Sequence, residues 1–177
     1  MKRKAFWWMA QISLFVVAAS LGALGQTQLS FRGTINDYAP ANVSPTGPWL
    51  VGGDWTLVVN GTSGKADFKA SLTMVRSDYW VSLHGDPNDP SGRTPHSHDI
   101  TLLNGTVTAI AGGFRVSGMA SVVASGNVPP FGQMSPLTVD ITGGTAVPFS
   151  NIKVTFGSPA SGHFGTQPLD GVVQSFK

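Results

Sequence analysis

Short stretches in which apolar and polar residues alternate recur along this chain. The clearest is 66–75, where the apolar residues from Phe68 to Met74 alternate with charged and hydroxyl side chains. Because successive side chains of a strand point to opposite faces, this period of two predicts a β-strand with one buried face. No window after residue 25 keeps the helical period over three turns. The pattern therefore predicts an all-β protein.

The chain is expected to form about nine strands, separated by turns rich in glycine and proline. Among them are the segments 29–35, 54–60, 66–75, 79–84, 96–103, 106–111, 114–123 and 137–141. We predict a single antiparallel β-barrel or a strongly curved β-sandwich over residues 26–177. The barrel is preferred, because closure removes exposed strand edges in a chain with few charged edge residues.

Two of the four histidines, His96 and His98, stand two positions apart at the start of a predicted strand. Asn104-Gly105 predicts a two-residue hairpin turn further along, because both positions of such a turn favour a positive φ. That register places His98 opposite Ala111 and both histidines on the more apolar, inward face, with alanine or glycine across from them. We therefore expect two imidazoles beside space that a ligand could fill.

Three interpretations of this pair remain open. The histidines could donate to loop carbonyls and close the end of the sheet, since a buried polar group without a partner costs about 1–3 kcal/mol. They could coordinate a divalent transition metal, namely zinc, copper or iron, which imidazole suits. They could also bind a small organic ligand, or act as acid and base in a cavity.

A metal site needs at least three protein ligands, and two further histidines are candidates. His84 is the first, because a hairpin closed by the loop 85–95 would bring it next to His96. The apolar alternation of its strand sets it on the opposite face, so a twist or bulge would be needed. His163 is the second, either as a loop residue folded over the barrel mouth or as a solvated one. Three aspartates are weaker candidates: Asp86, Asp89 and Asp99.

The segment 95–107 resembles the first motif of the cupin family, in which two histidines in an H-x-H pair precede a strand, a glycine turn and another strand. The departures decide against that family. The glutamate that cupins place after the pair is absent, as the chain contains no Glu. In the second motif, Pro130-Phe131-Gly132 lacks the histidine that should follow. We treat the likeness as a shared hairpin pattern.

The N-terminus predicts export. Lys2, Arg3 and Lys4 precede an apolar run that reaches Leu24, as in a secretory signal peptide covering residues 1–25. The alternative is an uncleaved membrane anchor, because the run is about long enough to span a bilayer. After cleavage we expect a secreted or periplasmic protein that no longer contacts the membrane.

Removal of that segment changes the charge balance. Of the 11 Lys and Arg, eight remain against nine Asp, which gives a net charge of −1. Because the remaining basic residues are scattered, the chain lacks the basic patch that nucleic-acid binding requires. The absence of cysteine rules out disulfides and thiol chemistry. The sequence gives no indication of an oligomeric state.

Familiar catalytic motifs do not occur in the sequence. It contains no Gly-x-Ser-x-Gly elbow and no phosphate-binding glycine loop. The leading expectation is a secreted barrel that binds a metal ion or small molecule in a histidine-lined pocket, with lyase- or cyclase-like acid/base chemistry as an extension. The alternative is a non-catalytic module that binds a surface or carbohydrate through exposed aromatics such as Trp49, Trp80 and Phe131. The more ordinary interpretation is that these aromatics pack loops onto the barrel ends, and Trp80 is also a candidate pocket residue.

Overall fold

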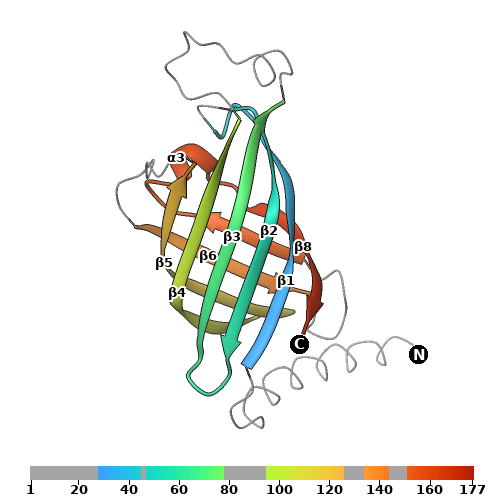
Figure 1. The fold of residues 1–177 in the computed structure, drawn as a ribbon. Coiled ribbons are helices and arrows are strands. Elements are labelled where there is room, and N and C mark those ends of the chain that lie inside the picture. Colours follow the sequence, from blue (N-terminus) through green and yellow to red (C-terminus); the bar gives the residue numbers. More distant parts are fainter. Residues whose placement is uncertain (1–27, 45–46, 78–94, 126–133, 144–150) are drawn as a thin grey trace, which may run out of the picture.

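The computed structural model describes residues 28–44, 47–77, 95–125, 134–143 and 151–177. These residues form eight strands and one short helix (Figure 1). The strands are β1 (Gln28–Ala39), β2 (Trp49–Asn60), β3 (Lys65–Arg76), β4 (His96–Ile110), β5 (Gly113–Ala124), β6 (Ser135–Thr142), β7 (Asn151–Phe156) and β8 (Leu169–Phe176); the helix is α3 (Ser161–Phe164).

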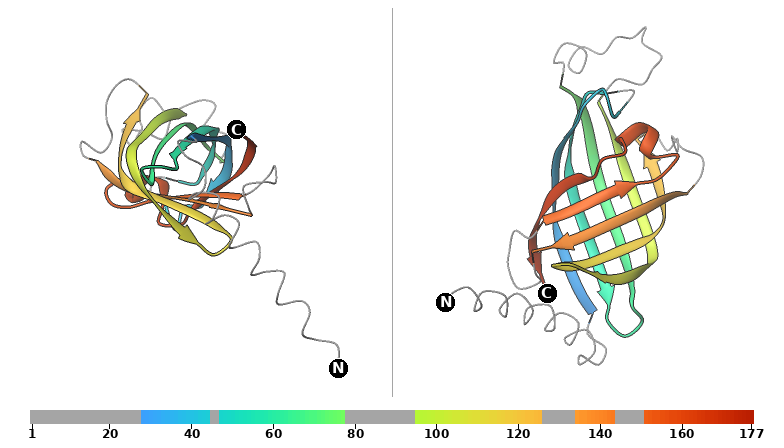
Figure 2. Two further views of the ribbon diagram at one scale, coloured as in Figure 1. Left: turned by 90° about the horizontal axis from the view of Figure 1, so that it is seen from below. Right: turned by 180° about the vertical axis from the view of Figure 1, so that it is seen from behind.

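The strands close into an antiparallel barrel in which each pairs with its neighbour in sequence, and β8 pairs back onto β1. Figure 2 shows the ring of strands from the end and from behind. The prediction of an all-β barrel is confirmed. In the described part of the chain, no helix is long and apolar enough to cross a membrane.

The alternating pattern explains which side chains fill the barrel. In β3 every second residue from Ala66 to Met74 is buried, while the residues between them are mostly exposed. The same period places Phe31, Trp55 and Leu57 inside from the two preceding strands. Burial of these large side chains is the main favourable contribution to closing the barrel.

The predicted turn at Asn104-Gly105 is wrong. β4 runs through both residues, and the two-residue turn to β5 lies at Ala111-Gly112 instead. Asn104 does adopt a positive φ of 55°, but within a bulge, where its N–H donates to Asp67 Oδ1 at 2.7 Å. A bulge and a hairpin turn can both accommodate positive φ, so the local signal did not distinguish them.

This correction changes the partners of the histidines. His98 lies opposite Ala124 of β5, not opposite Ala111. An alanine therefore does lie opposite His98, as expected, but it is the last residue of β5 and not a residue of the predicted turn. Ala111 and Gly113 lie at the opposite end of the β4–β5 hairpin, so they are not next to the imidazoles.

Three predicted features lie outside the described residues. They are the signal peptide over residues 1–25, the strand 79–84 and the loop 85–95 apart from its last residue. Among the described strands, most extend beyond their predicted limits; β2, for example, begins at Trp49 rather than at Asp54.

Candidate metal centre

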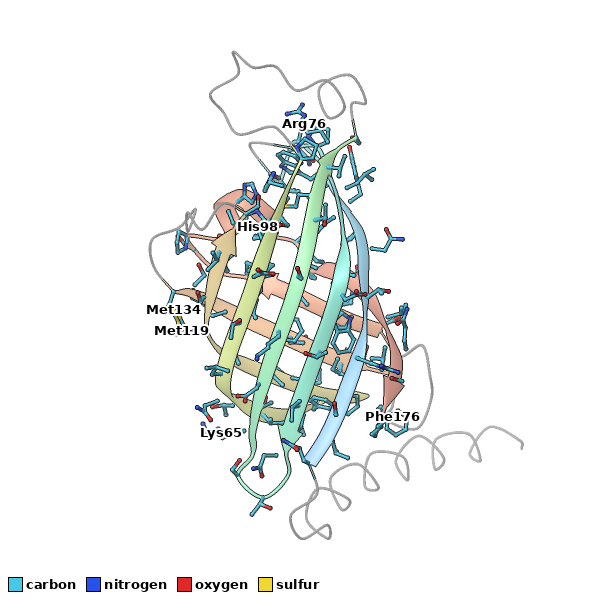
Figure 3. All side chains as sticks on the ribbon, in the orientation of Figure 1. Lys65, Arg76, His98, Met119, Met134 and Phe176 are labelled. Atoms are coloured by element: carbon cyan, nitrogen blue, oxygen red, sulfur yellow. The ribbon has the colours of Figure 1, made fainter. Side chains whose placement is uncertain are left out.

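His96 and His98 lie at the start of β4, on the strand face that continues inward through Ile100 and Leu102. They pair across to β3, with His98 opposite Leu72 and His96 opposite Met74. His98 is buried, with 1% of its surface exposed, whereas His96 is half-buried. Figure 3 places His98 near the end of the barrel that carries Arg76, away from Lys65.

His163 reaches the same place from α3, the short helix between β7 and β8. Its Nε2 lies 3.0 Å from Nε2 of His98 and 3.1 Å from Nε2 of His96. The three ligand nitrogens all lie within 4.8 Å of one another. One of the two histidines expected as a third ligand therefore joins the pair, while His84 lies outside the described residues.

The two short contacts share one nitrogen. A neutral imidazole Nε2 offers either one hydrogen or one lone pair, so the contacts of His163 with His96 and with His98 compete for it. Three lone pairs directed at one cation would avoid this competition. Three nitrogens held by a tetrahedral zinc ion at about 2.0–2.1 Å are separated by about 3.3 Å. The two separations that involve His163 are close to this value. The nitrogens of His96 and His98 lie within 4.8 Å of each other and would have to reach the same separation to enclose such an ion.

Burial keeps the imidazoles of His98 and His163 in the neutral form that binds metals. Burial, together with the neighbouring His163 and His96, lowers the pKa of His98 from 6.5 to about 3. Burial and, to a lesser extent, the neighbouring His96 lower the pKa of His163 from 6.5 to about 4. Both side chains are neutral at pH 7, so a metal ion would not have to displace protons from them.

Aromatic side chains surround the three rings. Trp49 meets the ring of His96 edge-on at a centroid distance of 5.0 Å and lies 6.0 Å from the ring of His163. Phe164 packs against His98 at 5.0 Å and stacks on Phe156 at 4.3 Å. These contacts exclude water from the inner side of the cluster and restrict the orientations of the imidazoles.

The expectation that Trp49 could form an exposed platform is wrong, because its side chain is 0% exposed. It begins β2, faces inward and lies beneath the Arg76 guanidinium, whose Cζ is 5.9 Å from the ring centroid. Trp80 and Phe131, the other aromatics considered for surface binding, lie outside the described residues. Asp99, a weaker candidate ligand, is exposed on the outer face of β4.

Sequence reasoning missed the residues that support the site. Phe164 follows His163 directly, and an aromatic next to a candidate ligand was the available signal. Two buried serines also contact α3: Ser44 Oγ donates to the carbonyl of His163 at 2.6 Å, and Ser135 Oγ accepts from the N–H of Ala160 at 3.2 Å. Ser44 ends the glycosylation-type triplet Asn42-Val43-Ser44, which gives no indication of this contact, and Ser135 stands in no motif.

Fold and site together define an eight-stranded antiparallel barrel with a three-histidine cluster at one end. Comparisons of the chain with protein-family models, with curated proteins and with solved structures gave no significant match.

Proposed function

We propose that this protein binds a divalent transition metal ion through His96, His98 and His163. The observation that carries the proposal is the convergence of three imidazole nitrogens within 4.8 Å, from two elements far apart in sequence. Zinc, copper and iron are the candidate ions, because imidazole is a ligand common to all three. For divalent ions at such a site, copper is expected to bind more tightly than zinc.

The test uses untagged protein, because a polyhistidine tag would itself bind the metal. Zinc or copper binding is measured by competition with a chromophoric chelator, in the parent and in the variants His98→Gln and His163→Ala. We expect one equivalent to bind tightly in the parent and weakly in each variant. Asp99→Ala is the matched control, since Asp99 is next to His98 but faces outward.

A parent that binds no metal, or variants that bind as tightly as the parent, would contradict the proposal. Circular dichroism of each variant, recorded before titration, shows whether weak binding results from the missing imidazole or from unfolding of the variant.

The second candidate function is binding of a small organic ligand by the same imidazoles, with proton transfer of the lyase or cyclase type. It is supported by the neutral state of His98 and His163 at pH 7, in which each imidazole has one hydrogen-bond donor and one acceptor that can contact a bound ligand. This candidate gains support if the parent binds no metal but a ligand screen gives thermal shifts that His98→Gln abolishes.

Export is a separate part of the proposal and rests on the basic and apolar character of residues 1–25. N-terminal sequencing of protein recovered outside the cytoplasm should begin at Gln26. An N-terminus at Met1 in a membrane fraction would indicate an uncleaved anchor instead.

A further inference from the structure

Two buried serines hold the helix that carries His163. In the described part of the chain, few polar side chains are buried: Ser44, Arg76, His98 and Ser135. Both serines are 0% exposed, and each contacts α3 or its N-cap residue. A buried hydroxyl is costly unless it is hydrogen-bonded, so these two positions specify where the helix lies.

Ser44 contacts the end of α3. Its Oγ donates to the carbonyl oxygen of His163 at 2.6 Å. The last carbonyls of a helix have no partner within that helix, and this bond satisfies one of them away from water. Because the carbonyl belongs to His163 itself, the bond fixes the backbone from which the imidazole projects.

Ser44 is itself held firmly in the connection between β1 and β2. Its N–H donates to the carbonyl of Pro40 at 3.0 Å, and its own carbonyl accepts from the N–H of Gly47 at 2.8 Å. Gly165, just after α3, approaches the same connection, since a Cβ there would lie 3.2 Å from the carbonyl oxygen of Val43. Its φ of 95° disfavours other residues as well.

Ser135 contacts the start of the helix. Its Oγ accepts from the N–H of Ala160, the N-cap residue, at 3.2 Å. Ser135 begins β6, where it pairs with Ala120 of β5. The helix is thus attached at its two ends to two different parts of the barrel.

We propose that Ser44 is a positioning residue of the metal site, acting through His163, and that Ser135 assists it from the other end of α3. This inference rests on the proposed metal binding. A helix of four residues has little stability of its own, so its placement depends on tertiary contacts. Residues that orient metal ligands typically change metal affinity by about 10–100-fold when they are removed.

The experiment compares Ser44→Ala and Ser135→Ala with the parent, as untagged protein, by chelator competition with copper and zinc. We expect Ser44→Ala to bind about 10–100-fold more weakly. Ser135→Ala should have a smaller effect, because its bond lies three residues from His163. Val59→Ala, at the far end of β2 from Trp49, is the control for a general loss of core packing.

A double-mutant cycle separates positioning from simple destabilisation. In a His163→Ala background, Ser44→Ala should cause no further loss of copper affinity, because the residue it positions is gone. In the metal-free parent, the amides of Phe164 and Gly165 should also exchange with solvent more slowly than in Ser44→Ala. Their hydrogen bonds, to Ala160 and Ser161, belong to α3.

Several outcomes would overturn the inference. The inference is wrong, while the proposed metal binding stands, if Ser44→Ala leaves the metal affinity unchanged. It is also wrong if Ser44→Ala lowers the copper affinity equally in the parent and in the His163→Ala background. A loss in Val59→Ala as large as that in Ser44→Ala would also overturn the inference. If the parent binds neither copper nor zinc, the proposed function fails first, and this inference fails with it.

Discussion

The Nε2 atoms of His98 and His163 lie 3.0 Å apart, although the two residues are 65 positions apart in the chain. His98 belongs to β4, a strand of 15 residues, and His163 belongs to a four-residue helix. The site is therefore as rigid as the packing of that helix against the barrel, and most of the following predictions concern this junction.

Metal binding should stabilise the folded protein. A ligand that binds only the folded state raises the free energy of unfolding by about 2.7 kcal/mol at a free concentration of 100 times its Kd. Thermal unfolding with and without zinc measures this, and addition of a chelator should reverse the shift. His98→Gln should unfold at the same temperature with and without zinc; an equal shift in this variant would indicate binding elsewhere.

The metal-free protein should lose stability as the pH falls below neutral. In the folded state the pKa of His98 is lowered to about 3 and that of His163 to about 4, whereas in the unfolded chain both return to about 6.5. Between these values the unfolded chain binds protons that the folded protein does not. The contribution of the two histidines to the free energy of unfolding is therefore fully present above pH 6.5, and it declines as the pH falls toward 4 and 3.

The free energy of unfolding should change with pH by at most about 1.4 kcal/mol per pH unit for each histidine. Urea unfolding at a series of pH values measures it. His98→Gln should show a shallower dependence over the same range. If the free energy of unfolding of this variant falls with pH as steeply as that of the parent, His98 does not contribute to the pH dependence.

Phe164→Ala should strongly destabilise the protein and weaken metal binding. The side chain is 0% exposed and stacks on Phe156 at 4.3 Å, so its removal leaves a cavity between α3 and β7. Truncations of this kind cost about 3–5 kcal/mol. Phe176→Ala is the control: that ring stacks on Phe31 but is 39% exposed, and its loss should cost less. Urea unfolding of both variants gives the comparison, and equal costs would contradict it.

Gly162→Ala should stabilise α3 and tighten metal binding slightly. Gly162 is exposed within the helix, and a Cβ there would meet no atom within 4 Å. Replacing glycine with alanine in a helix gains about 0.5–1 kcal/mol. Because the neighbouring His163 would then be better ordered before binding, zinc affinity should rise by a few-fold at most. A decrease in affinity would show that α3 must deform to bind the ion.

Local patterning in the sequence determined the fold class and part of the site. The alternation of apolar and polar residues in 66–75 predicted a strand with one buried face. The burial of the side chains along β3 follows that prediction residue by residue. The spacing of His96 and His98 likewise placed both on one strand face, because a period of two is a property of the extended backbone itself. These conclusions need no knowledge of distant residues.

Only the tertiary structure decided which residues meet. Asn104-Gly105 forms a bulge rather than a turn, because pairing along β3 and β5 continues past it and outweighs the local preference. His163 joins His96 and His98 because closure of the barrel brings α3 to the end where β4 begins, with Ser44 and Ser135 fixing its place. Such contacts depend on how the whole hydrophobic core packs, whereas the pattern along the chain reports only which face of each strand is buried.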